Sequence, residues 1–94
     1  MTFLISHFYE GGTQSQYDAV VGTVHPEGGL PPGQIFHAAG PAEGGYLIVA
    51  TWDSKASFET FLTGTLLPAL GGIEGGFGGP PQEHSCEVAR LVTA

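Results

Sequence analysis

The chain has 94 residues, of which 41% are hydrophobic and 12% are charged, and its formal net charge is −7. This length fits one small domain, residues 1–94, and the composition is too apolar for a disordered chain. Lys55 and Arg90 are the only Lys or Arg residues. Because nucleic acids and anionic membranes are bound through several such cations, we expect neither as a partner.

The number of cysteines and the lack of targeting signals help to predict the cellular compartment of the protein. Cys86 is the single cysteine, which excludes an internal disulfide and fits a reducing environment. The first residues show no basic segment followed by a signal-length apolar stretch, and no apolar run approaches the ~18 residues that span a bilayer. These features predict a soluble cytoplasmic protein.

The first half of the chain predicts a strand, a helix and a second strand. Residues 2–9 alternate as a strand, with Phe3, Ile5, His7 and Tyr9 on one face and Leu4, Ser6 and Phe8 on the other. A capping box at Thr13 and Gln16 starts a helix, which Pro26 ends. Its apolar stripe consists of Tyr17, Val20, Val21 and Val24. After a loop over 27–33, residues 34–39 form a strand in which Ile35, His37 and Ala39 lie opposite Gln34, Phe36 and Ala38.

The second half repeats this order. Residues 40–45 form a tight connection, so the strand over 46–52 is expected to make a hairpin with the preceding one. Asp53 or Ser54 caps a second helix, and Pro68 places a turn or a short extra helix after Leu66. The glycine-rich residues 71–81 have the character of a lid, and residues 82–93 form the last strand.

The element order is β-α-β-β-α-β, the ferredoxin-like α+β pattern. Two helices cover one face of such a sheet, yet the first and third strands are apolar on both faces. An uncovered face of that kind is a large apolar patch. We therefore predict a homodimer in which two sheets meet face to face, close into a barrel and enclose a hollow.

Three segments carry a family resemblance: residues 11–20 (GGTQSQYDAV), 36–41 (FHAAGP) and 44–54 (GGYLIVATWDS), the last followed by Phe58 and Phe61. Together they resemble the dimeric α+β barrel superfamily, and within it small proteins of the antibiotic-biosynthesis-monooxygenase type. The resemblance implies the fold and the dimer over nearly the whole chain. The superfamily includes cofactor-independent monooxygenases of polyphenolic polyketides, haem-degrading enzymes, isomerases, cyclases and members without known activity. One departure counts against an oxygenase: the second helix has Phe58 and Phe61 where a tyrosine would supply a phenol near the cavity.

Histidines are the main candidates for chemistry. His37 lies mid-strand among apolar residues and is a candidate general base or hydrogen-bond donor in the cavity, and His7 follows the same logic. Either can instead be a histidine satisfied by the backbone or the dimer interface. Arg90, as a strand residue, can stabilise an enolate or form an ion pair. His84 is expected to be exposed and His25 to complement a helix C-terminus.

Aromatic residues supply a candidate binding wall. Trp52 either packs in the core beneath the second helix or orients a planar ligand, and Tyr46 and Ile48 share its face. No close His/Cys spacing indicates a metal site, and no phosphate-binding loop precedes a helix. Cys86 is most simply a small buried hydrophobe. We expect no metal and no cofactor, with haem ligation by a histidine as an alternative.

These observations favour a small cofactor-independent enzyme of the monooxygenase, cyclase or isomerase kind. It would act on a hydrophobic aromatic or polyketide-like small molecule through histidine acid–base chemistry, because an electron-rich enolate can react with dioxygen directly. The rival hypothesis is a non-enzymatic barrel protein that binds a small ligand, since ionisable groups are few.

Overall fold

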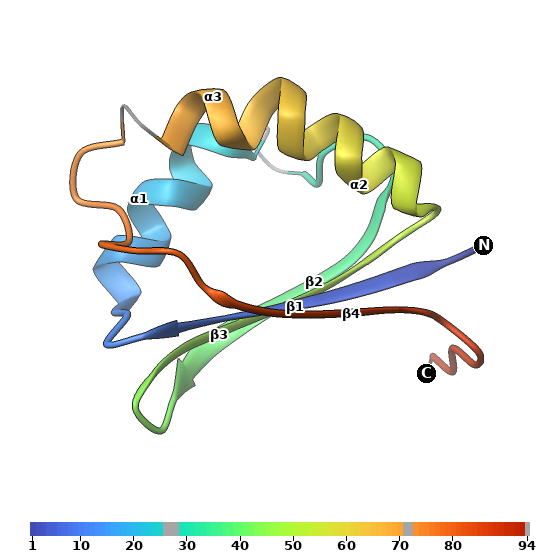
Figure 1. Ribbon diagram of the computed structural model, residues 1–94, viewed down its shortest axis with the longest axis horizontal. Helices are drawn as coiled ribbons and strands as arrows, with labels where there is room; N and C mark the ends of the chain where they lie inside the picture. The colour runs from blue at the N-terminus through green and yellow to red at the C-terminus, as the bar shows by residue number, and fades with distance from the viewer. Residues whose placement is uncertain (26–28, 71–72, 94) are drawn as a thin grey trace.

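The structure, a computed structural model, describes residues 1–25, 29–70 and 73–93. Its four strands form one antiparallel sheet in the order β2-β3-β1-β4. The helical elements lie together on one face of this sheet, and the other face carries none of the described helices (Figure 1). The elements are β1 (Phe3–Glu10), α1 (Gln14–Val24), β2 (Gln34–Ala42), β3 (Gly45–Trp52), α2 (Lys55–Phe61), the π-helix η1 (Leu62–Leu66), α3 (Leu67–Leu70) and β4 (Gln82–Glu87).

This arrangement confirms the predicted ferredoxin-like α+β fold. The two helix starts follow the sequence signals. Thr13 accepts a hydrogen bond from the Gln16 backbone N–H while the Gln16 side chain accepts one from the Thr13 N–H, which completes the capping box. Ser54, one of the two predicted caps, accepts from the Ser57 N–H. Pro26, predicted to end α1, lies outside the described residues. None of the described helices has the length and apolar character needed to cross a membrane.

The segment around Pro68 is a short extra helix, α3, one of the two predicted outcomes. It continues from α2 through the π-helix η1, in which the Leu67 N–H donates to the Leu62 carbonyl five residues back. Proline lacks an N–H and its ring clashes with the carbonyl four residues earlier in a regular helix. The wide turn of η1 immediately before Pro68 absorbs that break, so one long helical layer covers the sheet (Figure 1).

One predicted face assignment in β2 is wrong. A register shift between Gln34 and Phe36 marks a β-bulge, so Gln34 pairs with Trp52 and Phe36 pairs with Thr51. Simple alternation predicts Gln34 on the face opposite His37. The bulge reverses this and brings both side chains to the helix-covered face.

The last strand is shorter than predicted. β4 ends at Glu87, which pairs with Phe3 at the start of β1, and the Val88 N–H then donates to the Thr2 carbonyl. Beyond this point β1 offers no further residues for pairing, so residues 88–93 leave the sheet (Figure 1). Arg90 is consequently an exposed residue after β4 and not a strand residue.

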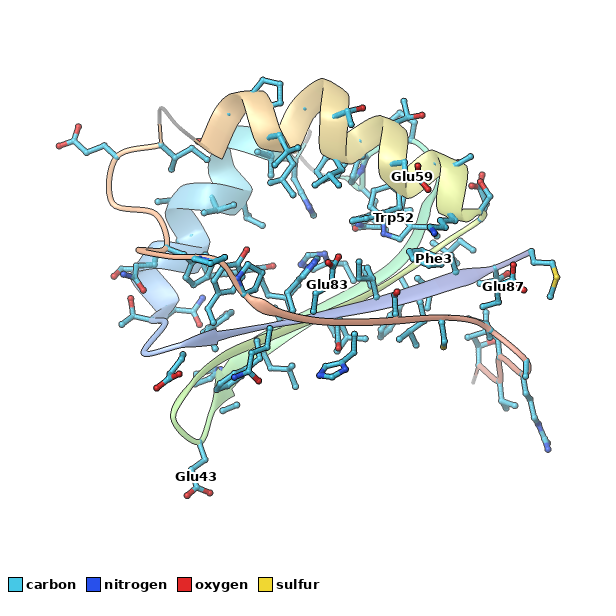
Figure 2. All side chains as sticks on the ribbon, in the orientation of Figure 1. Phe3, Glu43, Trp52, Glu59, Glu83 and Glu87 are labelled. Carbon is cyan, nitrogen blue, oxygen red and sulfur yellow. The ribbon has the colours of Figure 1, made fainter. Side chains whose placement is uncertain are left out.

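The core lies between the sheet and α2. Trp52 is 1% exposed and packs against Phe58 and Phe61, with ring centroids 5.7 and 5.3 Å away. Figure 2 shows Trp52 and Phe3 pointing from the sheet toward α2. The buried cluster comprises Phe3, Ile5, Ala50, Trp52 and Phe58. Core packing, one of the two interpretations offered for Trp52, is thereby confirmed.

Candidate functional site

A small hollow lies between the sheet and the helices, on the face that carries the core. Its volume is about 70 Å³. The predicted catalytic residues His7 and His37 line it, as do the predicted wall residues Ile48 and Trp52. The expected position of the hollow between two sheets is therefore wrong for these side chains. Successive side chains of a strand point to opposite faces of the sheet, and these four belong to the sets of β1, β2 and β3 that face the helices. The remaining lining residues are Ile5, Tyr9, Tyr17, Val20, Val21, Val24, His25, Gln34, Ala50, Phe58, Phe61, Leu66 and Phe77.

A short hydrogen bond joins two polar side chains of this lining. The Tyr17 hydroxyl on α1 lies 2.6 Å from His37 Nε2 on β2. Burial raises the pKa of Tyr17, with Tyr46 and Asp18 adding to the effect, so the phenol keeps its proton at neutral pH. The Tyr17 hydroxyl can donate or accept a hydrogen bond, so it holds the ring of His37 in either tautomer. Because this bond uses Nε2, the Nδ1 atom of His37 is available for another hydrogen bond or a proton transfer.

Tyr46 is buried behind this pair and supports it. Its ring stacks on Tyr17 with a centroid distance of 4.9 Å, and its hydroxyl donates to Gln14 Oε1 over 3.0 Å. Although it was predicted to bind substrate, Tyr46 is not among the described residues that line the hollow. It holds Tyr17 in place from the sheet side.

His25 approaches His37 from the C-terminal end of α1. The two rings meet edge to face with centroids 4.8 Å apart. Burial lowers the pKa of His37, and the neighbouring His25 lowers it further; burial alone lowers the pKa of His25. Both imidazoles are therefore neutral at pH 7, and His37 is available as a base.

Three polar atoms of the lining are buried without a hydrogen-bond partner in the part of the chain that is described. They are His37 Nδ1, Trp52 Nε1 and Gln34 Oε1. Buried polar atoms are normally paired, and each exception needs an explanation, of which a catalytic role is one. The second interpretation of Trp52, a residue that contacts a ligand, therefore remains open beside its role in the core.

Phe77 closes one side of the hollow. Its ring stacks on Tyr9 with a centroid distance of 3.8 Å and an interplanar angle of 8°. The segment that carries it is the predicted lid, of which Gly71 and Gly72 lie outside the described residues. A side chain at Gly12 would meet both the Phe77 ring and the Tyr9 carbonyl at 3.0 and 2.9 Å. Glycine at that position is thus what lets Phe77 seat against the sheet.

The other predicted site residues do not join this group, although His7 also lines the hollow. His7 bonds through Nε2 to Glu83 Oε1 at 3.3 Å, while Arg90 is exposed beyond β4 and does not line the hollow. His84 is exposed as predicted, and Cys86, predicted as buried, is exposed because all six residues of the edge strand β4 are exposed. Among the residues that the structure describes, no group of three or more His, Cys, Asp or Glu side chains is arranged to hold a metal ion.

Tyr17 and His25 are the site residues that sequence reasoning missed. The sequence pattern predicts Tyr17 as part of the apolar stripe and His25 as a helix-end residue. Tyr17, Val21 and His25 nevertheless follow one another at intervals of four, which places them on a single helix face. That spacing was the available signal that both polar groups face the sheet.

A wider groove of about 720 Å³ adjoins the hollow, lying between the end of α1, the segment before β2 and α2. Val24, His25 and Phe61 line both spaces and separate them. The small inner hollow is therefore one side-chain layer away from the groove.

The neutral histidine pair makes stability depend on pH. Below the ordinary histidine pKa of 6.5 the unfolded chain takes up protons that the folded chain, with both pKa values lowered, resists. The free energy of unfolding should therefore be at its full value above pH 6.5 and fall as pH drops below it. Urea unfolding at pH 7.5 and 5.5 measures the decrease, which should be smaller in a His25→Gln, His37→Gln double variant. An equal decrease in both proteins would contradict this account.

The fold is that of antibiotic-biosynthesis-monooxygenase-like proteins, as the sequence resemblance implied. No family profile and no curated protein matches the sequence. The similarity is found in solved structures, and those described below share less than 20% sequence identity with this chain.

Three such structures match over nearly the whole chain. A Chloroflexus aurantiacus protein described as an antibiotic biosynthesis monooxygenase superposes with a TM-score of 0.69 at 14% identity, covering 99% of this chain and 98% of its own. SnoaB, a cofactor-independent oxygenase from Streptomyces nogalater, gives 0.65 at 14% identity, with 99% and 97% covered. The monooxygenase ActVA-Orf6 of Streptomyces coelicolor, solved with nanaomycin D, gives 0.58 at 18% identity, with 99% and 91% covered.

Proposed function

We propose that this protein is a cofactor-independent monooxygenase for a hydrophobic aromatic small molecule. The observation that carries the proposal is His37: its Nε2 is held by Tyr17 and its Nδ1 is buried without a partner in a mostly apolar hollow. A lowered pKa keeps the imidazole neutral and thus basic at pH 7. The shared fold with cofactor-independent oxygenases supports the reaction type.

The chemistry requires only a base, dioxygen and a dry site. For an anthrone-type substrate, Nδ1 of His37 takes a proton from the acidic CH₂ carbon and leaves a carbanion. The carbanion reduces dioxygen and a C–O bond forms, giving a peroxide that takes the proton back from His37. Loss of the second hydrogen from that carbon breaks the O–O bond and yields a carbonyl and water. Water exclusion by the apolar walls strengthens each hydrogen bond along this path.

Oxygen uptake with an anthrone tests the proposal. The expected result is consumption of one dioxygen per anthraquinone formed, well above the uncatalysed oxidation. Binding of the aromatic compound without any oxygen uptake above background would instead identify the rival function, a non-enzymatic ligand-binding protein. Formation of a rearranged product without oxygen uptake would point to an isomerase or cyclase.

We further propose that the protein acts as a homodimer joined through the uncovered sheet face. This face carries the side chains Leu4, Phe8, Phe36, Ala38, Leu47 and Val49, of opposite parity to those in the hollow. Phe36 and Leu47 are 51% and 39% exposed. Contiguous apolar surface of this kind marks an interface, and a second copy supplies a matching one.

Replacing Phe36 with aspartate is expected to give a monomer, because a charge buried in an apolar interface is strongly unfavourable. Sedimentation equilibrium should show twice the mass of one chain for the natural protein and a single-chain mass for the variant. Leu67→Asp is the matched control, since Leu67 is 55% exposed on the helical layer. A natural protein that sediments as a monomer at micromolar concentration would contradict the proposal.

A further inference from the structure

The β-bulge in β2 creates a polar pair on the floor of the hollow. By pairing Gln34 with Trp52, it sets the two side chains directly opposite each other on adjacent strands, on the inward face. Without the bulge, Gln34 would point to the uncovered face with Phe36. The bulge thus places the amide of Gln34 beside the indole of Trp52. With regular alternation, the indole would have no polar neighbour at this position of the adjacent strand.

The two side chains do not satisfy each other. Gln34 Oε1 and Trp52 Nε1 are both buried and both lack a hydrogen-bond partner in the described part of the chain. Leaving a buried acceptor and a buried donor unpaired is destabilising. A purely structural floor would be better built with an apolar side chain at position 34, so the amide oxygen indicates a ligand.

We propose that Gln34 determines specificity by accepting a hydrogen bond from a hydroxyl of the ligand, an inference that rests on the proposed function. A hydroxyl is donor and acceptor at once. One phenolic O–H can therefore donate to Gln34 Oε1 while its oxygen accepts from the Trp52 Nε1–H.

Gln34 and Trp52 together favour the protonated form of the ligand hydroxyl over the phenolate. A phenolate offers no proton to the amide oxygen, and the described lining contains no Lys or Arg to balance its charge. The anchoring hydroxyl must also differ from the atom that reacts, since His37 Nδ1 is a separate orphaned group. The ligand is therefore a hydroxyarene held by one undissociated phenol and deprotonated elsewhere.

Two probes that differ in whether the same oxygen carries a proton or a methyl group test this inference. Isothermal titration calorimetry, without oxygen, compares 1-naphthol with 1-methoxynaphthalene, whose ether oxygen accepts but does not donate. The natural protein is expected to bind 1-naphthol about tenfold more tightly. In Gln34→Met, which keeps the length of the side chain but removes the acceptor, the two affinities should become nearly equal through weaker naphthol binding alone.

Stability separates a ligand role from a structural one. Gln34→Met should unfold at the same temperature as the natural protein or higher, because it removes an unpaired buried oxygen. Gln82→Met, on β4 and exposed, is the matched control and should keep the tenfold preference. No preference in the natural protein, an unchanged preference in Gln34→Met, or a clearly lower unfolding temperature of that variant would each overturn the inference.

The outcome is independent of catalysis. A protein that shows the preference but never takes up oxygen would refute the monooxygenase proposal and leave Gln34 as a ligand-binding residue. A protein that oxidises anthrones while Gln34→Met keeps its preference would refute only the role of Gln34.

Discussion

Replacing His37 with glutamine is expected to lower the turnover of an anthrone about 10²–10⁴-fold, the range that a positioned general base contributes. Glutamine retains a polar group that can bond to Tyr17 Oη, but it does not titrate near neutral pH. The natural protein should also lose activity as pH falls below 6.5, because the lowered pKa of His37 places its protonation in that range. Oxygen uptake across pH 5–8 measures both effects.

The matched control is His84→Gln, because His84 is an exposed histidine on β4. It should leave both the turnover and its pH dependence unchanged. If His37→Gln turns over as fast as the natural protein, His37 is not the base. If it loses activity while retaining the acid limb of the pH profile, another group titrates in the reaction.

Truncating Phe58 to alanine is expected to lower the free energy of unfolding by about 3–5 kcal/mol, the usual cost of removing a buried phenylalanine. Phe58 is 6% exposed and contacts three aromatic rings. These are Phe3, His7 and Trp52. A domain of this size has a small margin of stability, so such a loss would leave much of the protein unfolded near room temperature.

Urea unfolding at one protein concentration measures this effect. Leu91→Ala provides the matched removal of an apolar side chain, since Leu91 is 49% exposed after β4. Its effect should stay within about 0.5 kcal/mol. A loss below about 1 kcal/mol for Phe58→Ala would show that α2 does not form the main core with the sheet.

Period-two and helical patterns were sufficient to predict the fold, because local signals dominate there. The capping box at Thr13 and the alternation from Tyr46 to Trp52 depend on neighbours in sequence, and both are as predicted. The errors arose where pairing with residues that are distant in the sequence determines the local structure. β4 stops at Glu87 because β1 begins at Phe3, and Gln34 turns inward because its pairing with Trp52 is offset by a bulge.

The site was predicted only in part, for a related reason. Strand parity placed Ile48 and Trp52 on one face and made His37 and His7 candidates for a cavity, but it does not show which side chains meet or which layer closes the space between them. The hydrogen bond from Tyr17 and the edge of His25 come from α1, and the angle at which a helix lies on a sheet is set by packing. Arg90 was misplaced together with the end of β4.

The small volume of the inner hollow affects the rates at which a ligand binds and dissociates. An engineered cavity of about 150 Å³ binds benzene, whereas this one measures about 70 Å³. Accommodating an arene therefore requires a wall to move, and Phe77, two residues after Gly75 with its positive φ of 78°, forms one such wall. Association should then be slower than diffusion and reach a plateau at high concentration, set by how often the wall opens. The same barrier lengthens the residence of a bound intermediate and protects it from water.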